Sequence, residues 1–265
     1  MLTPSIIDRL RPWGLTTMAQ ALQQQLSDPD QAQWRCADRL GLLVDAEWAA
    51  RESRGVARRV REAPRRLAAT PEDLDYQAPR QLPRALVRQL LQGEWIRQHE
   101  TVIITGPTGV GKTYLLCALG HAACRQHRRV RYYRLPRLLG EAAIARQTGQ
   151  WLSWLRQLRR WDLLCLDDWG FSSLTVDESH QLLEIIDDRY QERATAIASQ
   201  VPVDQWPALF PDATLGEAIL DRLVHHAHRL TLTGESMRKV LPRRGPDRTT
   251  EPADPVASTP GTREV

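Results

Sequence analysis

One eight-residue motif, Gly106 to Thr113 (GPTGVGKT), constrains this chain more than any other feature. It fits the pattern G-x-x-x-x-G-K-[ST] without a mismatch, an apolar stretch at 101–105 precedes it, and a helical pattern at 114–124 follows it. The backbone N–H groups of such a turn converge on an anion at the start of a helix, where the helix dipole also favours negative charge. The motif therefore predicts a nucleotide-phosphate site between a strand and a helix.

The residue types of this loop predict separate tasks. Gly106 and Gly111 allow a tight turn, and we expect Lys112 to reach the β- and γ-phosphates of ATP and Thr113 to ligate Mg²⁺. The alternative is a glycine-rich turn with a stray lysine. The other residues expected to contact the nucleotide are Pro107, Thr108, Gly109, Val110 and Tyr114.

A second motif, Leu163 to Asp168 (LLCLDD), ends an apolar run with two carboxylates. We expect Asp167 to hold the Mg²⁺ shell and Asp168 to activate water, because a phosphate loop needs an acidic strand to hold its metal. Two adjacent buried carboxylates also favour a cation between them, since an unpaired buried charge is costly. The alternative is a strand that ends in a solvated Asp-Asp turn.

The pattern along the chain divides it into four parts. Residues 1–69 read as helical and arginine-rich, which predicts a small all-α N-terminal domain for adaptor or oligomerisation contacts. Residues 70–83 are rich in proline and acid and predict a linker, and residues 242–265 predict a disordered tail. Residues 84–241 alternate between apolar runs and amphipathic helices, which predicts an α/β domain with a parallel sheet flanked by helices. The runs expected to form strands are 101–105, 130–135, 162–166 and 194–199.

Composition excludes several classes of protein. No apolar run approaches the roughly 18 residues of a membrane span, and the start of the chain lacks the pattern of a secretory signal, so we expect a cytoplasmic protein. The four cysteines form no CxxC pair, which argues against a zinc ribbon or a disulfide framework. Basic residues comprise 34 arginines and 2 lysines, and the net charge is +4. This charge permits a polyanionic partner without proving one.

The chain also resembles a known family. Residues 84–241 resemble the AAA+ ATPases of the DnaC-like group, and residues 1–241 resemble the IstB-like ATPases, which are ATP-binding helper proteins of insertion sequences. The resemblance implies an AAA+ P-loop core. The stretches that carry it are GPTGVGKTYLLCALG, DLLCLDDWG, SQVPVDQW and LGEAILDRLVHHAHRLTLTGESMRK.

The resemblance assigns roles to three more residues. Gln200 matches the sensor 1 position, although AAA+ proteins commonly have asparagine there, and a strand-capping polar residue is the alternative. Arg222 matches the arginine finger, which would act on the γ-phosphate of a neighbouring subunit; a surface salt bridge with Asp221 or Glu217 is the alternative. Arg238 matches sensor 2, which would contact nucleotide within the same subunit, against an ordinary arginine at a helix start.

Clusters of arginine predict a DNA-binding surface. Arginine suits phosphate because its planar fork can bind two oxygens, and the chain shows no base-reading module, so we expect largely sequence-independent binding to double-stranded DNA. The alternative is solvated helix ends in an arginine-rich chain. The candidate contacts are Arg134, Arg137, Arg156, Arg159 and Arg160.

These observations predict an ATPase that uses ATP and Mg²⁺. The resemblance implies that it assembles on DNA as a homo-oligomeric ring or spiral and assists the transposase of the same element. Many AAA+ enzymes end the acidic strand with Asp-Glu, whereas this chain has Asp-Asp, so we expect slow turnover. Two alternatives remain at this point, a replicative helicase loader of the DnaC type and an ATP-binding DNA scaffold with little hydrolysis.

Overall fold

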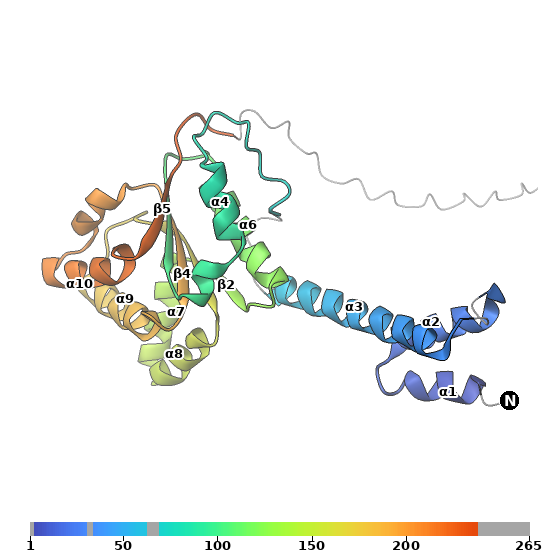
Figure 1. Cartoon of the computed structure of the whole chain (residues 1–265). Helices are drawn as coiled ribbons and strands as arrows, with labels where there is room; N and C mark the ends of the chain where they lie inside the picture. Colours follow the sequence, from blue (N-terminus) through green and yellow to red (C-terminus); the bar gives the residue numbers. More distant parts are fainter. Residues whose placement is uncertain (1–2, 31–33, 63–68, 238–265) are drawn as a thin grey trace, which may run out of the picture.

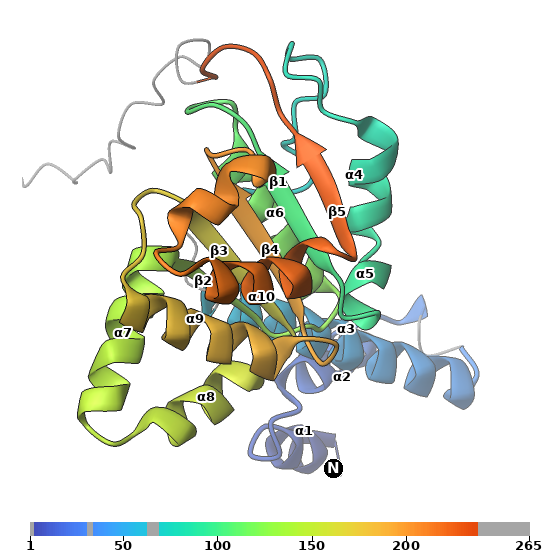
Figure 2. The same cartoon turned by 90° about the vertical axis from the view of Figure 1, so that its left-hand side faces the viewer.

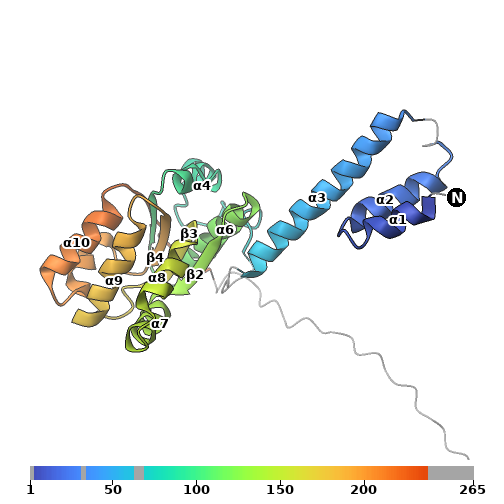
Figure 3. The ribbon, with the colours of Figure 1, turned by 90° about the horizontal axis from the view of Figure 1, so that it is seen from below.

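The N-terminal part of the molecule is a helical arm (Figures 1 and 3). The computed structural model describes residues 3–30, 34–62 and 69–237. The arm consists of α1 (Thr3–Leu10), α2 (Thr16–Ser27) and α3 (Cys36–Glu62). Helices α1 and α2 pack beside the start of α3, and α3 extends from there to the rest of the molecule, where it contacts α6. This agrees with the all-α N-terminal region expected from the sequence.

A carboxylate on α3 holds the start of α2. Helix α2 begins without a side-chain cap of its own. Instead, Glu47 Oε2 accepts hydrogen bonds from the backbone N–H groups of Thr17 and Met18, each at 3.0 Å. Its Oε1 is 3.0 Å from Arg51 Nε and 2.9 Å from Arg54 Nη2. The hydrogen bond from the backbone N–H of Met18 is the main cause that lowers the pKa of Glu47. The ionised carboxylate of Glu47 therefore connects α2 to α3.

The rest of the chain surrounds one parallel sheet with the strand order β2-β3-β4-β1-β5. The strands are β1 (Thr101–Thr105), β2 (Val130–Arg134), β3 (Leu163–Trp169), β4 (Ala194–Ser199) and β5 (Ala227–Thr231). The four expected strands are confirmed, and β3 runs three residues past its expected end at 166. The fifth strand was not expected. It lies at the sheet edge and is mostly half-exposed, so its sequence AHRLT carries little apolar signal.

Helices cover both faces of the sheet (Figure 2). They are α4 (Arg84–Leu91), α5 (Glu94–Arg97), α6 (Lys112–Arg125), α7 (Leu135–Gln147), α8 (Trp151–Arg159), α9 (Val176–Arg189) and α10 (Ala213–Val224), with a 3-10 helix at Val203–Leu209. No helix in the described ranges is long and apolar enough to cross a membrane.

Alternate residues along the strands pack into two separate cores. On β1, Val102 and Ile104 join the core beneath α4 and α6, whereas Ile103 joins the core beneath α7, α9 and α10. On β3, Cys165 and Leu166 divide in the same way. Both faces of the sheet are therefore buried, as the continuous apolar runs predict for a parallel sheet. The expected α/β architecture is confirmed.

The segment 70–83 is packed, although the sequence predicted a linker there. It contains no helix or strand, but Leu74, Arg80 and Leu82 are buried. The backbone N–H of Thr233 donates to Arg80 O at 3.1 Å, so the segment lies against the chain that follows β5. The expected domain start at residue 84 coincides with the start of α4. The expected tail at 242–265 lies outside the described residues.

Candidate nucleotide-binding site

The predicted phosphate loop, acidic pair and sensor meet at one edge of the sheet. The phosphate loop follows β1, the acidic pair lies near the end of β3, and the sensor follows β4. These three strands are neighbours, and the carboxyl ends of parallel strands lie on the same side of the sheet. Thr113 Oγ1 donates to Asp167 Oδ2 at 2.9 Å. Thr108 Oγ1 donates to Gln200 Oε1 at 2.8 Å. Residues from three motifs that are far apart in sequence therefore form one site.

The phosphate loop leads directly into α6. Gly111 precedes the helix with a φ of 99°, and within the described residues no side chain caps the helix start. The start of a helix is a place where backbone N–H groups and the helix dipole favour an anion. Lys112 is buried, and its Nζ donates to Pro107 O at 2.8 Å, so its ammonium lies over the loop.

Two loop glycines allow the chain after β5 to approach closely. A Cβ on Gly106 would lie 2.2 Å from Leu232 O, and a Cβ on Gly109 would lie 2.1 Å from Ser236 Oγ. Gly109 O accepts a hydrogen bond from Met237 N at 2.9 Å. The segment 232–237 therefore packs on the phosphate loop. The next residue, the predicted sensor Arg238, lies outside the described residues.

Asp167 is a buried carboxylate with three donors. It is 2% exposed. Besides Thr113, the Tyr132 hydroxyl donates to Oδ2 at 2.6 Å and the Asp168 N–H donates to Oδ1 at 3.0 Å. Burial, followed by the hydrogen bond to Asp167, raises the pKa of Tyr132, so the phenol stays protonated and remains a donor. Sequence reasoning did not identify Tyr132, because its proximity to Asp167 depends on the pairing of β2 with β3.

The donor set at Asp167 fits a magnesium ion. Thr113 Oγ1 and Asp167 Oδ2 are hard oxygen ligands 2.9 Å apart. Adjacent corners of a magnesium octahedron are separated by about 2.9 Å, since its bonds are about 2.0–2.1 Å long. The two residues predicted to hold the metal are thus positioned for one ion.

Asp168 is bound by an arginine. Its φ is 58°, and the pairing of β3 with β4 shifts between Leu166 and Trp169 around it. Arg134, at the end of β2, donates from Nε to Asp168 Oδ2, and this hydrogen bond is the main cause that raises the pKa of Arg134. The arginine clusters of the sequence predict Arg134 as a DNA contact. In the structure Arg134 forms an ion pair with Asp168, the second carboxylate of the acidic pair.

A buried arginine supports the phosphate loop from the segment 70–83. Arg80 Nη1 donates to Val110 O at 3.3 Å, and Nη2 donates to Asp75 O at 2.7 Å. Its Nε is buried without a partner among the described residues, and burial lowers the pKa of the group. Nearby, Tyr76 packs against the core. No signal in the proline- and acid-rich segment distinguishes Arg80 beforehand.

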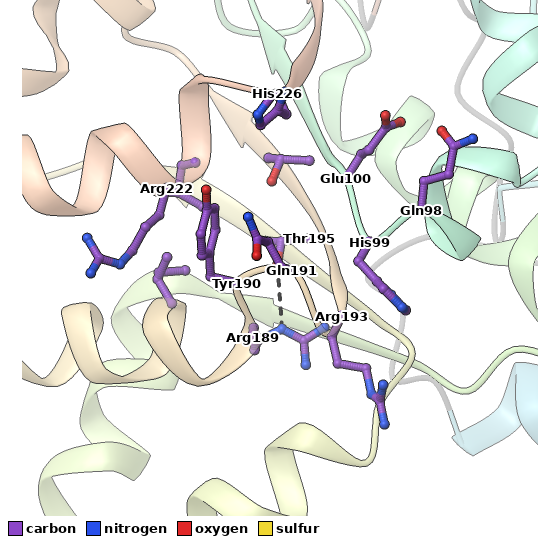
Figure 4. Close-up of a pocket in the computed structure, with 13 residues that line it drawn as sticks. Gln98, His99, Glu100, Arg189, Tyr190, Gln191, Arg193, Thr195, Arg222 and His226 are labelled. Atoms are coloured by element: carbon purple, nitrogen blue, oxygen red, sulfur yellow. Dashed lines mark hydrogen bonds between the residues drawn. The ribbon is translucent and has the colours of Figure 1, made fainter.

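Arg222 lies near the amino ends of the strands, whereas the phosphate loop lies at their carboxyl ends. It borders a cavity of about 230 Å³ with Thr101 and Thr195, at the amino ends of β1 and β4. Four residues of strand, or about 13 Å, separate Thr101 from the carboxyl end of β1. Arg222 Nε is 2.6 Å from Asp187 Oδ1, and Figure 4 shows the guanidinium directed away from Glu100 and Gln98. The partner is thus Asp187 rather than Asp221 or Glu217, and Arg222 does not reach its own phosphate loop.

The five arginines expected at DNA do not form one cluster. Arg134 is the last residue of β2 and Arg137 lies in α7, where its Nε is 3.2 Å from Glu141 Oε1. Arg159 pairs with two carboxylates of α9 and its following turn, at 3.6 and 3.4 Å. Arg160 lies near the amino ends of β2 and β3, where it lines a second cavity. Arg156 Nε donates to a backbone carbonyl of its own helix at 3.1 Å.

Known proteins share the fold and the sequence pattern. The crystal structure of DnaI matches with a TM-score of 0.54 and 19% identity, over 63% of this chain and 92% of that chain. The insertion sequence ATP-binding protein y4pL of Sinorhizobium fredii is 47% identical over 90% of this chain and 98% of its own length. The ATP-binding protein of insertion sequence IS1162 from Pseudomonas fluorescens is 43% identical over 76% of this chain and 88% of its own length. The family of IstB-like ATP-binding proteins matches residues 8–244. The chain therefore belongs to the IstB-like ATP-binding proteins, with a P-loop core around a parallel five-stranded sheet and a helical N-terminal region.

Proposed function

We propose that this protein binds ATP with Mg²⁺ at residues 106–113 and hydrolyses it slowly. The observation that carries the proposal is the 2.9 Å hydrogen bond between Thr113 and Asp167, which joins the phosphate loop to the acidic strand. A phosphate loop and a metal-holding aspartate at one point are the parts that phosphoryl transfer to water requires.

Each residue of the site has a task in this proposal. Lys112 and the first N–H groups of α6 bind the phosphates, and Thr113 and Asp167 hold the metal. The ion, when bound, neutralises charge that develops on the phosphates. Asp168 orients the attacking water once Arg134 releases it. Gln200, which contacts Thr108, senses the γ-phosphate.

Matched variants test this activity. Lys112→Ala should abolish ATP binding, whereas Asp168→Asn should retain binding and lose hydrolysis by about 100-fold or more. Asp177→Asn, which changes an exposed carboxylate on α9, is the control and should behave like wild type. Wild-type turnover should stay below about 10 s⁻¹, the typical enzyme median. Full hydrolysis by both active-site variants contradicts the proposal.

We also infer that the protein acts in the cytoplasm as a helper of transposition. The support is the naming of its relatives, at up to 47% identity, as ATP-binding proteins of insertion sequences. In this proposal ATP promotes a homo-oligomeric ring or spiral on double-stranded DNA, Arg222 acts on the nucleotide of the neighbouring subunit, and the assembly directs a transposase to its target.

Two measurements test the DNA and transposase roles. The affinity for duplex DNA should fall steeply with salt, because contacts to the phosphate backbone release counterions. A transposase should co-purify with the full chain, and a replicative helicase should not. Recovery of the helicase instead would favour a helicase loader. Electron microscopy with duplex DNA and a non-hydrolysable ATP analogue should show closed or spiral assemblies, and monomers on DNA would contradict this part of the proposal.

A further inference from the structure

A second cavity lies beside the edge strand β2, away from the phosphate loop. Its volume is about 390 Å³. Three of its lining residues are cationic and three are aromatic: Arg129, Arg131, Arg160, Tyr133, Trp154 and Trp161. No carboxylate lines it among the residues that the structure describes. We call it the β2 cavity.

The alternation of side chains along a strand explains which residues of β2 line this cavity. Side chains two residues apart point to the same face of a strand, so Arg131 and Tyr133 share one face, and Arg129 directly precedes the strand. Val130 and Tyr132 point the other way, into the core beneath α6. Helix α8 and the residues after it provide the opposite wall. β2 is an edge strand, so no further strand of the described part of the chain pairs with its outer side.

Two of the three arginines that line the β2 cavity have no ion-pair partner among the described residues. Arg131 lies 5.0 Å from the ring centre of Tyr133 and 5.6 Å from that of Trp161, and its Nη2 donates to the Tyr133 hydroxyl at 3.2 Å. Within 3–30, 34–62 and 69–237, no carboxylate forms an ion pair with Arg131 or Arg160. Arg129 has one carboxylate, Asp162, at 3.8 Å. The cavity thus presents oriented guanidinium groups next to aromatic surface.

We propose that the β2 cavity binds one nucleotide unit, an aromatic base together with its phosphate. Tryptophan and tyrosine rings stack on bases of any sequence, and arginine binds phosphate through two oxygens. The volume is in the range of small-ligand pockets, about 300–1,000 Å³. The residues that line this cavity include none of the phosphate loop or the acidic pair, so the two sites are separate. The unit comes either from an unpaired stretch of a DNA strand or from a free nucleotide.

The test measures binding of a fluorescein-labelled oligothymidylate of roughly 15 nucleotides without ATP, by fluorescence anisotropy. Arg160→Gln and Arg131→Gln should each weaken binding about fivefold or more. Arg156→Gln is the matched control, because Arg156 lies on α8 outside the cavity; it should change binding less than about twofold. Arg160 is exposed, so its variant should fold normally even if Arg131→Gln loses stability.

A second measurement locates the base. Oligonucleotides that carry 5-iodouracil should cross-link by light to Tyr133, Trp154 or Trp161, as peptide mass mapping would show. Cross-links confined to other parts of the chain, or equal losses of affinity in all three arginine variants, would overturn the proposal. Equal losses of affinity would indicate that the oligonucleotide is attracted by positive charge in general and not by the β2 cavity.

The source of the nucleotide is decided in a Lys112→Ala background, which removes binding at the phosphate loop. Thymidine monophosphate that competes at the same concentration as the oligonucleotide identifies a free-nucleotide site. An oligonucleotide that binds at least tenfold more tightly identifies a strand site. Both outcomes support the proposal, which does not depend on ATP hydrolysis: Asp168→Asn should leave this binding unchanged, so failure of one proposal leaves the other standing.

Discussion

Arg134 at the end of β2 donates a hydrogen bond from Nε to the carboxylate of Asp168 on β3. The arginine is half-exposed, whereas the side chain of Asp168 is 13% exposed. The bond therefore occupies an oxygen of the carboxylate proposed to orient water, from a position that solvent or a ligand can reach. An anion that attracted Arg134 would break its ion pair with Asp168, which connects the surface of the protein to its proposed chemistry.

Removal of this ion pair should raise ATP hydrolysis. Arg134→Gln removes the arginine from Asp168, the carboxylate proposed to accept a proton from water, and we expect basal turnover to rise about two- to tenfold, a fraction of what a general base contributes. The measurement is steady-state phosphate release without DNA. Arg137→Gln is the control, because Arg137 lies three residues on and pairs with Glu141 instead. A fall in turnover with unchanged ATP affinity would show that Arg134 assists the reaction directly.

Loss of the buried carboxylate should weaken the binding of Mg²⁺. Asp167→Asn keeps the shape of the side chain but removes the charge that attracts Mg²⁺, so turnover at saturating ATP should fall roughly 100-fold or more. Tyr132→Phe is the control: it removes one hydrogen bond to Asp167 and leaves the charge. It should reduce turnover less than about tenfold. A magnesium titration of both variants checks this, and an Asp167→Asn variant with wild-type metal dependence would refute the assignment.

Mixing of two inactive variants should restore activity if Arg222 acts between subunits. Arg222→Ala keeps its phosphate loop, and Lys112→Ala keeps its arginine, so a mixed assembly contains some complete sites. We expect the mixture to recover roughly a quarter of wild-type turnover, while each variant alone stays about 10³-fold below wild type. Arg229→Ala is the control, because Arg229 is a nearby exposed arginine on β5. This variant should be active without mixing. No recovery on mixing would contradict action in trans.

The helical arm should become less stable in acid through Glu47. The folded-state pKa of Glu47 is lowered from its model-compound value of 4.5, so its contribution is present above that value and is lost as pH falls through the folded-state pKa. Glu47→Gln should lower Tm by roughly 3 °C or more at pH 7. The difference from wild type should disappear near pH 3 or below.

Limited proteolysis between α2 and α3 provides a second measurement of this prediction. Asp45→Asn is the matched control, because Asp45 is an exposed carboxylate on the same helix. An equal effect of both substitutions at pH 7 would mean that helix charge, and not the cap on α2, stabilises the arm.

The sequence predicts those features of the structure that depend on residues close to one another along the chain. The phosphate loop, the acidic strand and four of the five strands follow from glycine spacing and from continuous apolar runs, which need no knowledge of neighbours. β5 was missed because an edge strand needs few apolar residues. The segment 70–83 was read as a linker from its prolines and acids, but Leu74 and Leu82 are buried. Two apolar residues in a polar segment give no periodicity that would reveal this packing.

The residue pattern alone predicts the kind of protein, a P-loop fold with a helical arm and candidate residues for ATP and metal. Which charged groups meet depends on the tertiary structure. The order of strands puts β2 next to β3, and this adjacency brings Tyr132 to Asp167 and Arg134 to Asp168. The partner of a long arginine side chain depends on which strands and helices are neighbours in space. With 34 arginines in the chain, sequence spacing cannot distinguish one that binds an internal carboxylate from one left for a partner.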